Sequence, residues 1–174
     1  MSPEIVKLAL LLLFAPLVII AGMKDISSFT IPNWISIALA GAFLPAALVS
    51  GMSLADMGIS LAIGVGVLAV GAGMFAMGWI GGGDAKLMAG AMLWLGLTGA
   101  APFALFTALA GGGLALTLLA LRSAWVRPFT ATGPAWVGRL ATPGEAAPYG
   151  VAIAVGALAA FPESLVMRAT HLVL

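Results

Sequence analysis

The sequence predicts an all-α polytopic membrane protein with about six transmembrane helices and short loops. Three observations support this prediction. Hydrophobic residues make up 63% of the 174 residues and charged residues only 7%, whereas soluble domains carry roughly a quarter charged residues. The apolar residues fall into six runs separated by short breaks. The chain length fits that number, because one crossing of the hydrocarbon layer takes about 20 residues.

The expected spans are separated by segments that contain glycine, proline or charged residues. We interpret the first as a retained span, because no small-residue cleavage site of a signal peptide follows it. The break after the fourth span rests on Thr98 and Gly99, but a merged helix of roughly 35 residues is longer than a bilayer needs. Residues 162–174 are expected to lie along the membrane interface. The six spans are expected at Ile5–Met23, Trp34–Val49, Met57–Trp79, Leu87–Leu97, Pro102–Leu121 and Ala146–Phe161, within one integral membrane domain of residues 1–174.

The composition excludes several classes of function. Seven basic against six acidic residues form no basic stripe, so nucleic-acid binding is not expected. The chain has no cysteine, which excludes disulfides, thiolate nucleophiles and zinc–thiolate sites. The single histidine, His171, allows neither a histidine-rich metal cluster nor a Ser-His-Asp triad. We therefore expect no metal and no cofactor.

The placement of basic residues predicts an orientation. In the six-span arrangement, the segments Lys24–Asn33, Ile80–Lys86 and Arg122–Glu145 lie on one side of the membrane. Lysine and arginine are enriched in cytoplasmic loops. We therefore expect this side to face the cytoplasm and both termini to lie outside, in the inner (cytoplasmic) membrane. The cations on this side are Lys24, Lys86, Arg122, Arg127 and Arg139, against two elsewhere.

Two carboxylates are expected at this same face. Asp25 follows the first span, and Asp84 stands between the third and the fourth, so helix packing can bring them together. Ionisable groups beside hydrocarbon are costly and mark functional sites. Two adjacent carboxylates share one proton, and such a pair can act as general base and general acid on a peptide bond. The alternative for Asp25 is a solvated acid beside the topology-setting Lys24.

Three glycines, Gly81 to Gly83, precede Asp84. Glycine permits a close approach of backbones and unusual dihedral angles, and it weakens a helix. Non-helical backbone at membrane depth lines a cavity or is buried in protein. We therefore expect Asp84 to project into a water-accessible pocket where an extended substrate lies, and Lys86 to point away from it. The alternative is a glycine-rich turn in which Asp84 is the N-cap of the fourth span.

The ordered set of motifs resembles the type IV prepilin peptidases, which are membrane aspartyl proteases of the GxGD type. The resemblance covers nearly the whole chain and rests on four motifs, in order Asp25, Ile31-Pro32-Asn33, Gly81-Gly82-Gly83-Asp84-Ala85-Lys86 and Pro148-Tyr149-Gly150. By itself, Ile31-Pro32-Asn33 is typical of a helix start. Pro148-Tyr149-Gly150 is open to two interpretations, a turn into the last span with an interfacial tyrosine or a substrate-contacting motif.

The resemblance implies roles for individual residues. Asp25 and Asp84 would be the catalytic pair, Gly81 and Gly83 the fixed glycines of the motif, and Lys86 the basic position after it. The implied substrate is the short basic leader of a prepilin or pseudopilin, cut at the cytoplasmic face ahead of a hydrophobic helix. The implied partners are therefore that leader and membrane lipids.

Larger family members carry a cysteine-containing insertion between the first two spans, which is associated with N-methylation of the product. Here that loop has about ten residues and no cysteine, so we expect a peptidase only. The compact form resembles the short enzymes that serve Flp-type (tight-adherence) pili, and an archaeal preflagellin peptidase is a related alternative.

Two other classes of function remain open at the level of sequence. A small proton-coupled transporter would use Asp25 and Asp84 as relay acids near mid-membrane. A non-catalytic scaffold of a pilus or secretion machine would have both acids dispensable and far apart. Between residues 122 and 146, prolines and glycines predict an irregular segment that could gate the site, with its arginines at lipid headgroups.

Overall fold

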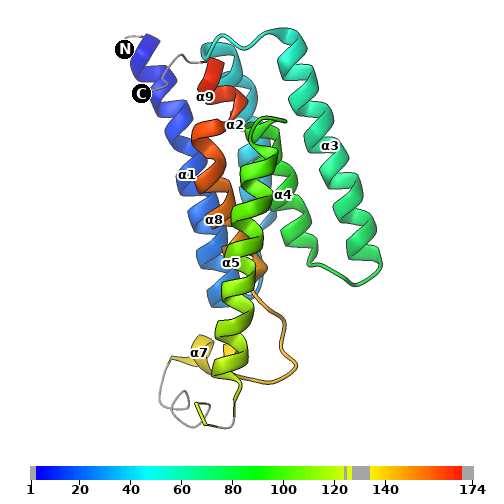
Figure 1. Cartoon of the computed structure of the whole chain (residues 1–174). Helices are drawn as coiled ribbons and strands as arrows, with labels where there is room; N and C mark the ends of the chain where they lie inside the picture. The colour runs from blue at the N-terminus through cyan, green and yellow to red at the C-terminus, as the bar shows by residue number, and fades with distance from the viewer. Residues whose placement is uncertain (1–2, 124, 127–133, 170–174) are drawn as a thin grey trace.

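Helices account for most of the chain, and the long ones run roughly along one common direction (Figure 1). The computed structural model describes residues 3–123, 125–126 and 134–169, and these contain no β-strand. The helices are α1 (Pro3–Ser28), α2 (Asn33–Val49), α3 (Leu54–Ala76), α4 (Gly82–Leu95), α5 (Ala100–Leu121), α7 (Ala135–Leu140), α8 (Tyr149–Ala160), the 3-10 helix η1 (Phe161–Glu163) and α9 (Leu165–Ala169).

The predicted all-α polytopic membrane fold is confirmed, although two of the helices are shorter than a full membrane span. A helix occurs at each of the six expected positions. Among the described residues, four segments are long and apolar enough to cross a membrane: Leu11–Ser28, Leu54–Ala76, Ala100–Leu121 and Tyr149–Ala169. The apolar helix α2 is shorter, with 17 residues, and α4 has 14. At 1.5 Å per residue α4 is only about 21 Å long, and it lies inside the bundle, so it needs no lipid-facing length of its own.

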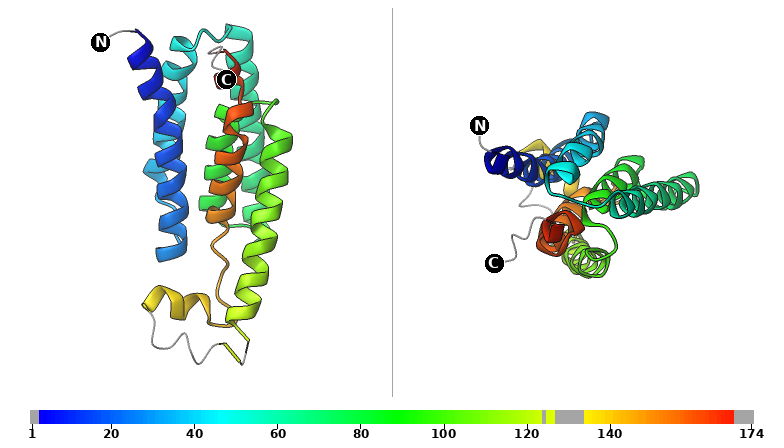
Figure 2. Two further views of the ribbon diagram at one scale, coloured as in Figure 1. Left: turned by 60° about the vertical axis from the view of Figure 1, so that its left-hand side comes forward. Right: turned by 90° about the horizontal axis from the view of Figure 1, so that it is seen from above.

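The helices α4 and α8 occupy the centre of the bundle. Helix α4 packs against α3, α2 and α8, while α8 packs against α5 and α1 (Figure 2). Small residues make the closest contacts: a Cβ on Gly71 of α3 would lie 2.9 Å from Ala85 Cβ of α4, and one on Gly22 of α1 would lie 3.2 Å from Ala154 Cβ of α8. Close backbone packing of this kind holds helices together in lipid, where the hydrophobic effect does not.

An aromatic cluster fixes α4 against its neighbours. Trp94 is fully buried, and its indole N–H donates to the carbonyl of Leu39 in α2 at 2.8 Å. Its ring lies 5.4 Å from that of Phe14 in α1, and Phe14 stacks on Phe161 at 4.5 Å. Trp94 therefore satisfies its one polar group while packing with three elements.

The two ends of the bundle differ. The loops after α1 and α3 and the segment after α5 lie at one end, where α7 is placed below the end of α1 (Figures 1 and 2). Arg122 ties this segment together by donating to the carbonyls of Leu140 at 3.0 Å and Glu145 at 2.9 Å. The expectation of an irregular segment is therefore wrong for 135–140, which is helical. Arg127 lies outside the described residues.

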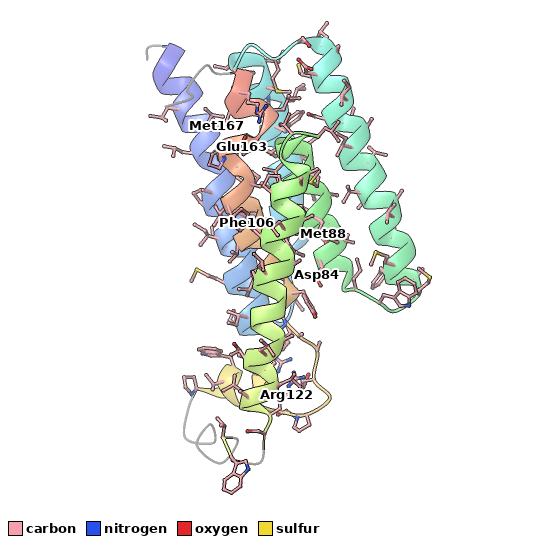
Figure 3. The ribbon with its side chains drawn as sticks, in the orientation of Figure 1. Asp84, Met88, Phe106, Arg122, Glu163 and Met167 are labelled. Carbon is pink, nitrogen blue, oxygen red and sulfur yellow. The ribbon has the colours of Figure 1, made fainter. Side chains whose placement is uncertain are left out.

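The expected interfacial tail is also different in the structure. Ser164 and Val166 are fully buried, and α9 packs against α4. Glu163 forms an ion pair with Arg168 at 2.7 Å, at the end of the bundle opposite Arg122 (Figure 3). Residues up to 169 thus close the bundle, because they cap the short α4 that leaves this end unfilled. His171 lies outside the described residues.

Candidate functional site

Asp25 is a buried acid near the end of α1. Its side chain is only 6% exposed, and its Oδ2 accepts a hydrogen bond from the backbone N–H of Gly150 at 2.6 Å. Gly150 is the second residue of α8, so the carboxylate lies at the N-terminus of that helix, where free N–H groups and the helix dipole favour negative charge. The alternative of a solvated acid is therefore wrong for Asp25.

Gly150 leaves the room that Asp25 needs. A Cβ on Gly150 would lie 2.8 Å from Asp25 Oδ2 and 2.8 Å from Ile31 Cδ1. The interpretation of Pro148-Tyr149-Gly150 as a turn into a helix is confirmed, because α8 begins at Tyr149. The contact with Asp25 was missed, since no spacing in the sequence pairs residues 125 positions apart.

Asp84 lies in the first turn of α4, as its third residue. The N-cap is Gly81, and the backbone N–H of Gly81 donates to the Asp84 carboxylate. Both expectations for its backbone are therefore wrong: Asp84 is neither in a non-helical segment nor the N-cap itself. The reason is that an acid at this position can reach back to the N-cap N–H, as in a capping box, which stabilises the start of a helix despite its glycines.

The glycines before Asp84 act through their size and not through unusual dihedral angles. Gly81 has an ordinary extended conformation with φ −71°, and Gly82 and Gly83 do not have positive φ either. A Cβ on Gly81 would lie 2.8 Å from Asp84 Oδ2, and one on Gly83 would lie 3.0 Å from Ile31 Cβ. The expected close approach is present, whereas the expected unusual dihedral angles are not.

The two acids line one cavity of about 290 Å³. Asp25 comes from α1 and Asp84 from α4, whose first turn lies beside the α3–α4 loop (Figure 3). The volume is well above the roughly 30 Å³ that a water molecule occupies in the liquid, so the cavity has room for a water and part of a peptide. Its other lining residues are Phe29, Thr30, Ile31, Gly81, Gly82 and Gly83.

The neighbouring acid changes the electrostatics of Asp84. The pKa of the Asp84 carboxyl is raised to about 6, mainly by burial and also by the charge of Asp25, while the N–H of Gly81 acts in the opposite direction. A like charge nearby disfavours the ionised form because two close carboxylates repel each other. Asp84 is therefore a carboxyl group that can hold a proton near neutral pH.

Lys86 points away from the cavity, as expected for a residue two positions after Asp84 in a helix. Its Nζ donates to Oδ1 of Asn33 at 2.9 Å. Asn33 is the first residue of α2, so the interpretation of Ile31-Pro32-Asn33 as a helix start is confirmed. The hydrogen bond itself was missed, although it joins two of the motifs and fixes the start of α2 to α4.

Three further residues lie in or next to the cavity, and no role beside the two acids was predicted for them from the sequence. Ile31 fills the space beside Gly83 and Gly150. Phe29 terminates α1 with φ 57°, a left-handed conformation unusual for a bulky residue. The guanidinium of Arg139 in α7 lies 4.4 Å from the centre of the Phe29 ring, a cation–π contact. This contact places α7 against the end of α1, next to the two acids.

The described residues contain no group of three or more His, Cys, Asp or Glu side chains placed to hold a metal ion. The polar groups that line this cavity are the two carboxyl groups, the hydroxyl of Thr30 and the backbone around them. Such a pair can activate a water by taking its proton and can protonate a leaving group.

Comparison with known protein families agrees with this arrangement. A family profile described as the type IV leader peptidase family matches residues 12–116, which is more than half of the chain. The chain belongs to the type IV leader peptidase family. The matched residues of this leader peptidase include both Asp25 and Asp84, whereas Gly150 lies beyond them. Comparisons with curated proteins and with solved structures give no match.

Membership and fold together establish the broad class of the protein. A leader peptidase is a protease, and several apolar helices of spanning length make this one a multi-pass membrane protein.

Proposed function

We propose that this leader peptidase is an aspartic endopeptidase that uses Asp25 and Asp84 as its catalytic pair. The observation that carries the proposal is that two carboxylates, from α1 and α4, line one cavity of about 290 Å³. Membership in a peptidase family supplies the reaction class. A chain without cysteine and with one histidine has few other groups for peptide hydrolysis.

In the proposed mechanism the pair holds one proton. In this proposal Asp84 carries the proton, because burial and the charge of Asp25 raise its pKa. Asp25 is ionised, because the N–H of Gly150 and the N-terminus of α8 favour a negative charge there. Asp25 takes a proton from a water molecule, whose oxygen attacks the carbonyl carbon of the scissile bond. The protonated Asp84 donates a hydrogen bond to the carbonyl oxygen, and the leaving amine is protonated by the pair as the C–N bond breaks.

The proposed substrate is the short basic leader of a prepilin or pseudopilin, followed by a hydrophobic helix. The cut is proposed at the cytoplasmic face of the inner membrane, because most cations of the chain belong to the segments at the end of the bundle that holds both acids and lysine and arginine prefer cytoplasmic loops. The loop between α1 and α2 is short and lacks cysteine, which supports peptidase activity without methyl transfer.

The test is the processing of a co-expressed prepilin-like substrate, read as a band shift. We expect Asp25→Asn and Asp84→Asn each to lower the cleavage rate by at least about a thousandfold, since isosteric amides cannot transfer the proton. Asp56→Asn is the matched control. Asp56 accepts a hydrogen bond from Ser53 Oγ at 2.7 Å at the start of α3, and we expect its loss to leave processing intact.

Normal processing by Asp84→Asn, with the variant inserted at wild-type level, would overturn the assignment. Proton flux into liposomes that depends on both acids, in the absence of cleavage, would instead support a transporter. Full complementation of pilus assembly by the doubly substituted chain would support a scaffold.

A further inference from the structure

A second and larger cavity, of about 490 Å³, lies beside the one that holds the two acids. Its floor is formed by α4, and its walls are formed by α2 and α3. Both of these helices pack against α4 but scarcely touch each other, and α3 stands out from the bundle on the far side of α4 (Figure 2). We call this cavity the α2–α4 groove.

The α2–α4 groove is shaped by helical stripes. The floor consists of Lys86, Ala89, Gly90 and Leu93, which is the i, i+3, i+4, i+7 spacing of one helix face. The walls have the same spacing, starting from Asn33 in α2 and from Leu61 in α3. Three helix faces with alanine and glycine thus lie side by side, and small residues of this kind let a further helix pack closely in a membrane. Seven residues of helix correspond to about 10 Å, so the groove holds about two turns.

The α2–α4 groove begins directly beside the acids. The hydrogen-bonded pair of Lys86 and Asn33 lies at one end of it, and these residues follow Asp84 and Ile31 of the first cavity by two positions each. One helical turn further lies Ser36, whose buried hydroxyl has no hydrogen-bond partner among the described residues. Beyond Ser36 the lining is apolar. The groove therefore changes from polar to apolar with distance from the acids.

We propose that the α2–α4 groove receives the first two turns of the hydrophobic helix that follows the scissile bond of the substrate. The inference rests on the proposed function. A peptide bond held at Asp25 and Asp84 continues past the Lys86–Asn33 pair, and its apolar side chains enter the deep part of the groove. The first turn of any helix has N–H groups without intrahelical partners, and a rotation of the Ser36 side chain, which lines the groove, would turn its unpaired hydroxyl toward one of them.

The first experiment is cysteine cross-linking, for which the natural absence of cysteine gives a clean background. Val65→Cys places a thiol in the groove, and Val70→Cys is its matched control, because Val70 is a similarly exposed valine of α3 (66% against 58%) outside the groove. The partner is a prepilin-like substrate with single cysteines along its hydrophobic helix, captured on the Asp84→Asn background. We expect disulfides from Val65→Cys to the first two turns only, with helical periodicity, and none from Val70→Cys.

The second experiment separates binding in the groove from catalysis. Val65→Trp fills the groove, and we expect it to raise KM for the full substrate about tenfold with little change in kcat, the pattern of lost ground-state binding. A short peptide that ends just after the scissile bond lacks the hydrophobic helix, so Val65→Trp should cleave it at the same rate as the wild type does. Val70→Trp should leave both reactions within about twofold of the wild type.

Each outcome decides between the two proposals. Equal effects of Val65→Trp and Val70→Trp, or equal cross-linking at both positions, would overturn the groove proposal while leaving the peptidase intact. Loss of a co-purified phospholipid from Val65→Trp, without any substrate cross-link, would assign the groove to lipid and also overturn it. Failure of the wild type to cleave either substrate, or cleavage by Asp84→Asn, would instead refute the proposed function.

Discussion

Each acid of the candidate site is paired with a glycine in the same way. Asp25 accepts a hydrogen bond from the N–H of Gly150, and Asp84 accepts one from the N–H of Gly81. A Cβ on either glycine would lie 2.8 Å from the carboxylate oxygen that faces it. The glycine thus supplies a donor and leaves space for the acid at once, so it determines the position of the carboxylate more strictly than a flexible side chain would.

Gly150→Ala should therefore lower activity more than stability. The new methyl group would push the Asp25 carboxylate and the Ile31 side chain apart, and a misplacement of about 1 Å at a catalytic group costs roughly a hundredfold in rate. The rate of leader cleavage by purified protein measures the effect. Gly112→Ala is the control, since a Cβ there meets nothing within 4 Å and alanine favours the interior of α5. Comparable losses of cleavage rate in Gly150→Ala and Gly112→Ala would show that the effect does not depend on the contact with Asp25.

Asp84→Asn should raise stability in a way that depends on pH. The folded protein holds the Asp84 proton up to a pKa of about 6, whereas the unfolded chain releases it near the ordinary value of 3.8. Because the folded state binds more protons between these values, the stability of the wild type falls as the pH rises from about 4 to about 6. The thermal midpoint of Asp84→Asn in detergent should exceed that of the wild type at pH 7, and the difference should shrink towards pH 4. A difference that stays constant with pH would contradict this.

At this scale, the sequence was informative about which residues matter and less so about how they are placed. Asp25 and Asp84 could be singled out because charged residues are rare in the chain. Their donors could not be identified in full, since Gly150 reaches Asp25 from a helix 125 residues away. The role of Asn33 as the partner of Lys86 also depends on how α2 and α4 pack, which no local pattern specifies.

Among the helices, α4 carries the most contacts relevant to the site. It presents Asp84 in its first turn, pairs with the start of α2 through Lys86, and provides the floor of the α2–α4 groove. Trp94 near its far end fixes it against α1 and α2. A change in how α4 packs would therefore move Asp84, Lys86 and the α2–α4 groove together.

Trp94→Leu should destabilise the protein by about 3 kcal/mol, as expected for the loss of a large buried aromatic side chain. The substitution also leaves the Leu39 carbonyl without the donor it has now. Unfolding in mixed micelles with increasing denaturing detergent measures the change in free energy. Trp79→Leu is the control, because Trp79 is 69% exposed and a loss there should be within about 0.5 kcal/mol. Equal effects of the two substitutions would show that the aromatic cluster does not hold α4.

The positions of the long helices could be predicted from apolar runs alone, but not the bounds of α4. Its start was expected at Leu87 and lies at Gly82, because glycines argue against a helix while the contact between Gly71 and Ala85 and the reach of Asp84 to Gly81 favour one. Tertiary contacts override local preference here. The burial of residues 164–166 was not predicted because it also depends on tertiary packing: Ser164 and Val166 fill the space beyond the end of the short helix α4.

At the level of the whole molecule, the uneven distribution of cations predicts one orientation in the membrane. Trp125, 87% exposed, belongs to the end that holds the two acids, and Leu54, 82% exposed, begins α3 at the opposite end. In intact cells, an impermeant thiol reagent should label Leu54→Cys and should label Trp125→Cys only after the membrane is permeabilised. The reverse pattern would place the acids outside and contradict the proposed cytoplasmic cleavage.

The hydrogen bond between Gly150 and Asp25 joins the first helix of the bundle to α8, which is made late. During translation, Asp25 and Asp84 are synthesised well before residue 150. The growing chain therefore contains both acids before the backbone N–H of Gly150, which binds Asp25, has been made. Under the proposed mechanism, we therefore expect activity only after α8 has been inserted beside α1. We expect a chain truncated before α8 to insert into a membrane but not to cleave a prepilin-like substrate.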